Sequence, residues 1–392
     1  MENTSNQLHN PEDSVVATYY IETKGDLAQV ARELVVLETT APWVAATEPT
    51  DLYQQAVGEV LEVRSTGSGR GYISLLYPII NMDIEESAFP CLWLSMIGGP
   101  TFALASYEKS RLVDFSIPQA MMAKFPGPAF GIAGTRRLVG LENDELLVGT
   151  IVKPTAGLTP EEVADFAYQA ALGGICFIKD DEKMMNPSYC PLGKRVKLVS
   201  EALKRAEEET GQKVLYAAHI TTTPDKIVER GLEALENGAT ALMVNFFAAG
   251  LFALQLLRQH PHINVPIYAH CGGREALGRS VGQGIAASVI AKMVRLLGGD
   301  YFRAGMHASY LVDTEEDIRT MHEAAIGLWS PLNPILPAVS GGLNPKTIGV
   351  NVSRLGRDNL FLAGTGILSH PAGPRAGVGA LKEAAAGVEL VS

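Results

Sequence analysis

The feature that most constrains the fold of this chain is an alternation of short apolar runs and longer stretches with helical periodicity, which begins near residue 146. Helical stretches such as Pro160–Ala171 and Leu198–Glu209 separate the runs, and Thr159 and Thr314 precede acidic residues, as helix-capping threonines do. Eight strand–helix units in about 245 residues predict an α/β fold, a (β/α)8 TIM barrel. The eight apolar runs are Leu146–Val152, Ile175–Ile178, Val214–Ile220, Ala241–Phe246, Val265–Ala269, Tyr301–Ala304, Ile335–Val339 and Leu360–Ala363.

A doubly wound parallel sheet is the structural alternative for the same alternation. The chain has no Gly-x-Gly-x-x-Gly motif opening a helix after the first of these runs, which disfavours the dinucleotide-binding form of that sheet. The barrel is therefore the preferred prediction.

The chain before residue 141 has a different pattern, in which strand-like and helical stretches do not alternate regularly. Leu27–Glu38 has helical periodicity, and the Pro- and Gly-rich segment Phe125–Gly131 resembles a connector. The strand-like runs are Val15–Ile21, Val60–Val63 and Ile73–Pro78. We therefore predict a flexible tail at residues 1–14, an N-terminal α+β domain of ferredoxin-like type at 15–140 and a catalytic barrel at 141–392.

Composition restricts the partners of the protein. Asp and Glu number 43 against 32 Lys and Arg, which gives a formal net charge of −11. Such a surface repels nucleic acid, so an anionic substrate must be attracted by a local site. The four cysteines are scattered without a Cys-x-x-Cys pair, which argues against a disulfide framework or a structural zinc site. The polar N-terminus and the lack of a membrane-length apolar stretch predict a cytoplasmic protein with no membrane partner.

Barrel enzymes carry their active sites at the carboxyl ends of the strands, so the polar residues that end each run are the candidates. In chain order they are Lys153, the run Lys179-Asp180-Asp181-Glu182, His219, Asn245, His270, Arg303, the turn Ser340-Gly341-Gly342 and the turn Gly364-Thr365-Gly366. His219 and Asn245 are the weakest members, since a single polar residue at a strand end is often structural.

The charged run after the second barrel strand predicts a metal site. Asp181 and Glu182 are hard oxygen ligands of the kind that Mg²⁺ prefers. Lys179 would repel a cation unless CO2 converts its amine into an anionic carbamate, which is itself an oxygen ligand. Alternatively, Lys179 is a Schiff-base lysine whose pKa is lowered by burial. A solvated loop of charges is the structural explanation for the same run.

The two glycine turns predict a phosphate site. Barrels frequently bind phosphate between the loops that follow strands 7 and 8, through backbone N–H groups. Arg303, at the end of strand 6, is a candidate clamp for an anionic group, although a structural ion pair would equally explain it. For Lys153, the two explanations are likewise a structural ion pair and a role in the site.

These residues together resemble the RuBisCO large-chain superfamily over most of the chain. The most specific match is Gly173–Glu182, which is similar to the metal motif of the family. The resemblance implies that Lys179 is carbamylated and that Asp181 and Glu182 complete the protein ligands of Mg²⁺. Lys153-Pro154 matches an active-site Lys-Pro and His270 a histidine after strand 5, while the two glycine turns match phosphate-binding loops.

Several positions depart from the carboxylases of that family. Thr155 stands where they have a second lysine, and Gly305–Val312 contains no counterpart of their mobile loop lysine. Arg303 stands in place of a phosphate-binding histidine and Cys271 in place of an arginine. The chain therefore resembles a RuBisCO-like protein, form IV, and we do not expect it to carboxylate ribulose bisphosphate.

Within that group, the resemblance implies an enzyme acting on a phosphorylated keto acid or keto sugar through an enediolate. The preferred reaction is decarboxylation of 3-oxo-isoapionate 4-phosphate in apiose catabolism, with Lys153 as the acid and His270 as the reserve. Enolisation of 2,3-diketo-5-methylthiopentyl 1-phosphate, or a related sugar-phosphate isomerisation or tautomerisation, is the alternative. Against the enolase, the segment Met96–Pro100 has no lysine where that enzyme has one. A metal-free Schiff-base aldolase using Lys179 and a non-catalytic binding barrel remain open. A homodimer or larger homo-oligomer is also implied.

Overall fold

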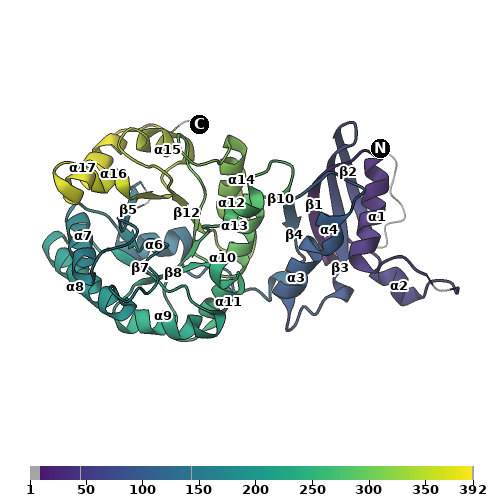
Figure 1. Ribbon diagram of the computed structural model, residues 1–392, viewed down its shortest axis with the longest axis horizontal. Helices are drawn as coiled ribbons and strands as arrows, with labels where there is room; N and C mark the ends of the chain where they lie inside the picture. Colours follow the sequence, from purple (N-terminus) through teal and green to yellow (C-terminus); the bar gives the residue numbers. More distant parts are fainter. Residues whose placement is uncertain (1–8, 45, 143, 391–392) are drawn as a thin grey trace. The chain divides into compact units, whose positions relative to one another are not determined.

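The computed structural model describes residues 9–44, 46–142 and 144–390, which form two compact units (Figure 1). One unit contains the described residues up to 125 together with residues 274–290. The other contains residues 126–273 and the described residues from 291 onward.

The second unit is a closed barrel of parallel strands. The eight strands described there pair in the order β5, β6, β7, β8, β9, β11, β12, β13, and β13 pairs with β5 to close the ring. Each one falls within a residue or two of a predicted run, which confirms the (β/α)8 prediction and shows that the doubly wound alternative is wrong. The strands are β5 (Leu147–Ile151), β6 (Phe177–Lys179), β7 (Leu215–His219), β8 (Ala241–Asn245), β9 (Ile267–His270), β11 (Tyr301–Arg303), β12 (Leu336–Val339) and β13 (Leu360–Ala363).

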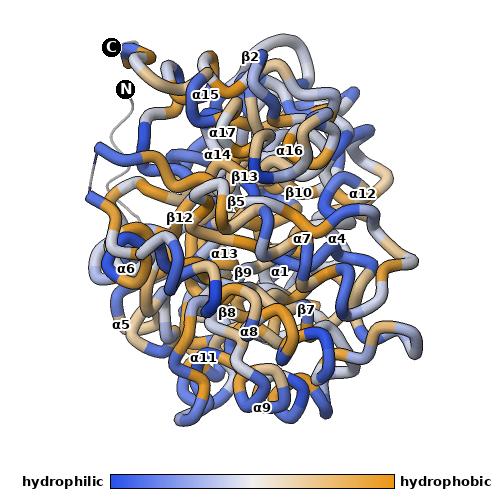
Figure 2. The backbone as a smooth tube through the Cα atoms, turned by 90° about the vertical axis from the view of Figure 1, so that its left-hand side faces the viewer, coloured by the Kyte–Doolittle hydropathy of each residue, from blue (hydrophilic) through white to orange (hydrophobic). Residues whose placement is uncertain are grey.

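Helices surround these strands as an outer ring (Figure 1). Thr159 and Thr314 form capping boxes with Glu162 and Asp317, as their sequence context predicts. Hydrophilic and hydrophobic residues alternate along helices such as α9 and α11, so one side packs inward (Figure 2). The helices are α6 (Gly131–Val139), α7 (Pro160–Leu172), α8 (Leu192–Thr210), α9 (Ile227–Glu236), α10 (Phe246–Ala249), α11 (Phe252–Gln259), α13 (Ala287–Leu296), α14 (Glu315–Ile326), α15 (Ile348–Leu355), α16 (Thr365–Leu368) and α17 (Gly373–Ala385), with a 3-10 turn at Pro224–Lys226.

The first unit contains a sheet in the order β10-β4-β1-β3-β2. Along β4, β1, β3 and β2 each strand is antiparallel to its neighbour, with α1 between β1 and β2 in the chain and helices α3 and α4 between β3 and β4. This order and connectivity confirm the ferredoxin-like α+β prediction. The elements are β1 (Ser14–Glu22), α1 (Leu27–Thr39), α2 (Asp51–Ala56), β2 (Glu59–Gly67), β3 (Arg70–Pro78), α3 (Ala88–Ile97), α4 (Gly99–Ala103), β4 (Lys109–Ser116), α5 (Gln119–Met122), α12 (Arg274–Gly278) and β10 (Gly284–Ile285), with 3-10 turns at Pro11–Asp13 and Ile79–Asn81.

Strand β10 comes from the segment between β9 and α13, far along the chain from the rest of this sheet. It pairs in parallel with β4, Gly284 lying opposite Arg111. Gln283 Oε1 accepts a hydrogen bond from the Ser110 amide at 3.1 Å, and Arg111 Nη1 donates to the carbonyl of Gly278 at 3.0 Å. Residues 274–290 therefore belong to the sheet unit although the chain reaches them from a barrel strand.

Part of the predicted N-terminal tail can be described. Residues 1–8 lie outside the described residues. Pro11–Asp13 forms a 3-10 turn, and His9 Nε2 lies 2.9 Å from the carbonyl oxygen of Val57. Among the described residues, no helix combines the length and the apolar character needed to cross a bilayer.

Asp300 organises the end of the barrel opposite the predicted site. It directly precedes β11 and is fully buried. Its carboxylate accepts hydrogen bonds from the amides of Phe130 (2.6 Å), Gly131 (3.1 Å) and Ile267 (2.8 Å), and it pairs with Arg258. One side chain thus joins the start of α6, the start of β9 and a helical arginine.

We expect Asp300→Ala to lower the free energy of unfolding by about 3–5 kcal/mol, because it removes the carboxylate that pairs with the buried Arg258 guanidinium and leaves three amides without their acceptor. Chemical denaturation followed by circular dichroism measures this loss. Glu323→Ala is the control, since it removes an exposed ion pair with Arg319 and should cost less than about 1 kcal/mol. Equal losses in the two variants would show that the buried cluster contributes no more to stability than an exposed ion pair does.

Candidate active site

All the predicted site residues lie at the carboxyl ends of barrel strands or in the loops that begin there. Parallel strands end at the same rim of a closed barrel, so residues far apart in the sequence become neighbours. Asn245 and His270, for example, lie opposite each other in the β8–β9 register.

Lys179 and Asp181 are buried charges at this rim. Lys179 is the last residue of β6 and is 2% exposed, while Asp181 is fully buried. The Lys179 ammonium lies 3.1 Å from the carbonyl oxygen of Asp180 and 5.5 Å from the centre of the Tyr268 ring. Burial lowers the pKa of the Lys179 amine, although nearby carboxylates oppose this effect. A lowered pKa favours the neutral amine, the form that reacts with CO2 or with a carbonyl group.

The donor set fits a magnesium site only if Lys179 takes part. Within the described residues, no group of three or more His, Cys, Asp or Glu side chains is placed to hold a metal ion. Asp181 and Glu182 supply two carboxylates, and a carbamate on Lys179 would supply the third oxygen donor. The residues present therefore fit the group that the sequence predicted, with oxygen donors from three positions of one four-residue segment.

Lys153 lies between the metal-ligand segment and one of the glycine turns. Its ammonium pairs with Asp181 Oδ2 at 2.5 Å and donates to Thr155 Oγ1 at 3.1 Å. A Cβ atom placed on Gly364 would lie 3.4 Å from Lys153 Cγ and 3.6 Å from its Cε. The stem of Lys153 thus passes beside the turn after β13, while its charged end reaches the turn after β6.

His270 lies beside Glu182, with its Nε2 3.7 Å from Glu182 Oε2. The Gly272 amide donates to His270 Nδ1 at 3.2 Å, and Asn245 Nδ2 lies 3.3 Å from the same atom. Because Nδ1 is thereby an acceptor, the proton of the neutral ring is on Nε2, facing Glu182. Burial, reinforced by the charge of Lys179, lowers the pKa of the imidazole well below 6.5. A neutral imidazole is a poor acid, so this environment favours Lys153 as the proton donor.

His219 is buried behind the rim. Its Nε2 lies 2.6 Å from Thr221 Oγ1, which also accepts the Asn245 amide at 2.8 Å. Asn245 in turn caps α10 through its side-chain oxygen. Because His219 is only 1% exposed, its position favours a supporting contact over a direct one with substrate.

The two glycine turns lie against each other. A Cβ atom on Gly366 would come within 2.2 Å of the carbonyl oxygen of Leu343, so only glycine permits this approach between the loops after β12 and β13. Gly341 has φ of +122°, a backbone conformation that favours glycine, and its carbonyl accepts from Ser309 Oγ at 2.7 Å. The loops after β12 and β13 are therefore in contact, and the phosphate site between them stays a prediction.

Arg303 is engaged with the loop that follows it. Its Nη2 donates to Asp313 Oδ2 at 2.6 Å, and its Nε lies 3.4 Å from the carbonyl oxygen of Ser340. The guanidinium thus touches the phosphate turn while it is paired with a carboxylate. Its predicted role as an anion clamp stays a prediction, and an arriving phosphate would compete with Asp313 for it.

Four side chains that support the site were not predicted as part of it: Thr155, Thr221, Arg195 and Asp313. Each contacts a predicted residue, or the neighbour of one, through a polar atom. Thr155 and Thr221 lie two residues beyond predicted positions, which is a local signal. Arg195 and Asp313 have none, because they reach the rim from α8 and from a loop.

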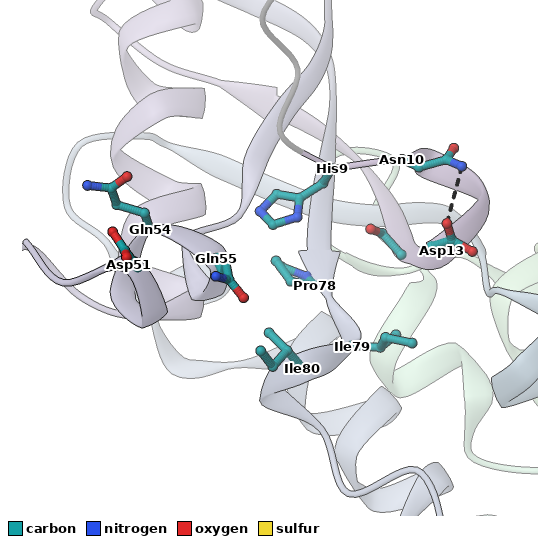
Figure 3. A pocket seen from close by; sticks show the side chains of 10 residues that line it. His9, Asn10, Asp13, Asp51, Gln54, Gln55, Pro78, Ile79 and Ile80 are labelled. Carbon is teal, nitrogen blue, oxygen red and sulfur yellow. Dashed lines mark hydrogen bonds between the residues drawn. The ribbon is translucent and has the colours of Figure 1, made fainter.

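A separate cavity of about 570 Å³ lies within the first unit (Figure 3). His9 lies above Pro78 and Ile80, with Gln55 beside them (Figure 3). The lining residues that the structure describes include carboxylates and amides and neither Lys nor Arg. That chemistry offers no cation to a phosphate, which favours the barrel rim as the substrate site.

Comparisons with known proteins place both parts of the chain in one family. Residues 131–389 match the ribulose bisphosphate carboxylase large chain, catalytic domain, and residues 4–121 match the N-terminal domain of the same large chain. The chain therefore belongs to the RuBisCO large-chain family.

Its relatives include several kinds of family member. The 3-oxo-isoapionate-4-phosphate decarboxylase of Rhizobium rhizogenes is 33% identical, over 95% of this chain and 92% of that protein. The octameric ribulose-1,5-bisphosphate carboxylase/oxygenase of Pyrococcus horikoshii OT3 superposes with a TM-score of 0.89 at 27% identity, over 96% of this chain and 88% of that one. A rubisco-like protein (MtnW) of Alicyclobacillus acidocaldarius has a TM-score of 0.83 at 30% identity, over 95% and 93%.

The burial of His219 predicts a pH-dependent stability. Burial lowers the pKa of its imidazole to about 4, against an ordinary value of 6.5. Between these two values the unfolded chain binds the proton first, so the stability contribution is complete above pH 6.5 and falls toward pH 4. We expect wild type to lose about 2 kcal/mol more than His219→Gln between pH 7 and pH 5. Denaturant unfolding at both pH values measures this, and parallel losses in the two proteins would contradict it.

Proposed function

We propose that this protein is a Mg²⁺-dependent RuBisCO-like decarboxylase of a phosphorylated 3-keto sugar acid, with 3-oxo-isoapionate 4-phosphate as the substrate. The observation that carries the proposal is the position of Lys153, between the carboxylate of Asp181 and the turn at Gly364. A proton donor at that point lies between the metal-ligand segment and the phosphate turns. It would face the reacting carbons of a substrate bound at both.

The metal would be held by Asp181, Glu182 and the carbamate of Lys179. When bound, Mg²⁺ would act there as a Lewis acid on oxygen atoms of the substrate. The burial of Lys179 supports this assignment, because it favours the amine that CO2 modifies. The pairing of Lys153 with Asp181 supports it further, since the same carboxylate already binds a cation.

The phosphate would be bound by backbone N–H groups of Gly341, Gly342, Gly364 and Gly366, with Ser340 and Thr365 completing the turns. Arg303 would add a charged donor when it exchanges Asp313 for the phosphate. Binding of this remote group fixes the orientation of the bond that breaks.

The reaction itself follows from the position of the keto group. In a 3-oxo acid, the bond to the carboxylate carbon breaks and CO2 leaves, while its electron pair delocalises into the neighbouring carbonyl as an enediolate. Lys153 then transfers its proton to the enediolate carbon, which gives a four-carbon ketose phosphate. His270, neutral and beside Glu182, is the reserve donor.

Three considerations favour this activity over the other candidates. A relative of 33% identity is named for it, although other relatives are carboxylases. Gly305–Val312 lacks the lysine of the carboxylases, and Met96–Pro100 lacks that of the salvage enolase. A Schiff-base aldolase using Lys179 would give Asp181 and Glu182 no part in the reaction.

We also propose a homodimer or larger homo-oligomer, because related structures include octameric and dimeric carboxylases.

Incubation with 3-oxo-isoapionate 4-phosphate and Mg²⁺ in bicarbonate buffer tests the proposal. We expect the substrate to be converted to a four-carbon ketose phosphate, with EDTA stopping the reaction, as followed by ¹³C NMR of labelled substrate. Enolisation of a diketo phosphate without CO2 release would favour the salvage reaction instead. Borohydride trapping of substrate on Lys179, with turnover insensitive to EDTA, would identify an aldolase. No turnover of any of these compounds would favour a binding barrel.

We expect Lys153→Met to slow turnover by about 100-fold or more with little change in KM, because it removes the proton donor and leaves the phosphate turns intact. Binding of Mn²⁺ should not weaken, since the variant removes a cation from Asp181. Lys183→Met is the control, a loss of an exposed lysine from the same segment. Steady-state kinetics distinguish the two, and equal rates for both variants would exclude Lys153 as the acid.

A further inference from the structure

The residue between two proposed metal ligands points away from them. Phe177, at the start of β6, belongs to the apolar core inside the barrel. Side chains alternate along a strand, so Lys179 and Asp181 share the side of Phe177, and Asp180 takes the opposite side. The contacts agree, because Asp181 meets Lys153 at the rim while Asp180 reaches Arg195 of helix α8.

Asp180 is a fully buried carboxylate that accepts hydrogen bonds from four donor groups on three residues. Arg195 donates to its Oδ2 from Nε (3.2 Å) and Nη2 (3.1 Å), and the His219 amide donates to the same oxygen at 2.9 Å. The Tyr216 hydroxyl donates to Oδ1 at 2.9 Å. Tyr216 and His219 both lie on β7, so Asp180 ties the end of β6 to the next strand as well as to α8. A buried charge with this many donors holds one geometry firmly.

Arg195 also restrains the residues that follow the ligand segment in the chain. Its Nη1 donates to the carbonyl of Cys190 at 2.8 Å, and its Nη2 donates to the carbonyls of Met184 (2.9 Å) and Met185 (3.0 Å). Asp181 and Glu182 are therefore bracketed by Asp180 before them and by residues 184–190 after them. The fully buried guanidinium of Arg195 therefore binds both Asp180 before the two ligands and the backbone carbonyls after them.

We propose that Asp180, Arg195 and Tyr216 are positioning residues that hold Lys179, Asp181 and Glu182 in the geometry that binds the divalent cation. The inference rests on the proposed function for the identity of the ligands. Without such support, the neighbouring carboxylates would repel one another and move apart when no cation is bound. Metal ligands must be held within a fraction of an ångström of their binding geometry. Outer partners of metal ligands typically change metal affinity 10- to 100-fold when removed.

Tyr216→Phe is the least disruptive test of the proposal, because it removes one hydroxyl group that donates to Asp180 and keeps the buried ring. Tyr301→Phe is the matched control. Tyr301 is an equally buried tyrosine of a barrel strand, and its hydroxyl accepts from Thr135 of α6 at 2.9 Å and not from the ligand segment. The two variants lose the same chemical group from the same barrel.

The measurement is Mn²⁺ binding in bicarbonate buffer, followed by electron paramagnetic resonance, together with the thermal unfolding midpoint. We expect Tyr216→Phe to raise the Mn²⁺ dissociation constant about 10-fold. Tyr301→Phe should bind as wild type does, with a comparable drop in the unfolding midpoint. Asp180→Asn should weaken binding further if it folds, but the conclusion depends only on the tyrosine pair.

The outcomes separate this inference from the proposed function. Wild-type binding that depends on bicarbonate, with equal affinity in Tyr216→Phe, would overturn the positioning role and leave the metal site intact. Equal weakening in both tyrosine variants would also overturn it, because the effect would then follow general stability. Absence of Mn²⁺ binding in wild type would instead overturn the proposed metal site, and the inference with it.

Discussion

The site depends on the parallel pairing of eight strands into a closed ring. This pairing forces every strand to end at one rim, and register then decides which residues are neighbours. Lys179 lies opposite Ile151 on one side and Ala217 on the other, while Asn245 lies opposite His270. These small or apolar neighbours help to exclude water from the Lys179 side chain. The chemistry of the lysine therefore follows from which strands pair, as much as from its own identity.

Two opposing requirements meet at the rim. The apolar layer inside the barrel stabilises the ring, with Phe177, Tyr268 and Tyr301 packed within 5.3–6.1 Å of one another between ring centres. The charges directly above that layer are costly to bury unless each has a partner. The structure provides partners on both faces of β6, Lys153 for Asp181 and Arg195 for Asp180. A segment with three consecutive carboxylates is thereby kept ordered next to a hydrophobic core.

The family relationship and the local geometry have different weight. Similarity over nearly the whole chain establishes the family and the fold, which the family uses for more than one activity. We expect the particular reaction to depend on a few positions, such as Thr155 and the loop Gly305–Val312, where the resemblance indicates that this chain departs from the carboxylases. Arg303 and Asp313, which flank that loop, form an ion pair, and Arg303 Nε lies 3.4 Å from the carbonyl oxygen of Ser340. Replacement of a few side chains at the rim of a shared fold can change the reaction without changing the barrel.

The sequence by itself determined the barrel, because buried parallel strands are continuous apolar runs and their spacing is set by the helices between them. It also predicted that Lys179, Asp181 and Lys153 lie at the rim, since polar residues at the ends of such runs must lie there. It did not reveal β4 or β10. The polar, charged strand Lys109–Ser116 owes its conformation mainly to antiparallel pairing with β1, and the two-residue β10 owes its conformation to parallel pairing with β4. Nor did it reveal the partners Arg195 for Asp180 and Asp313 for Arg303. Those contacts join separate elements, and only tertiary packing decides which buried charge meets which donor.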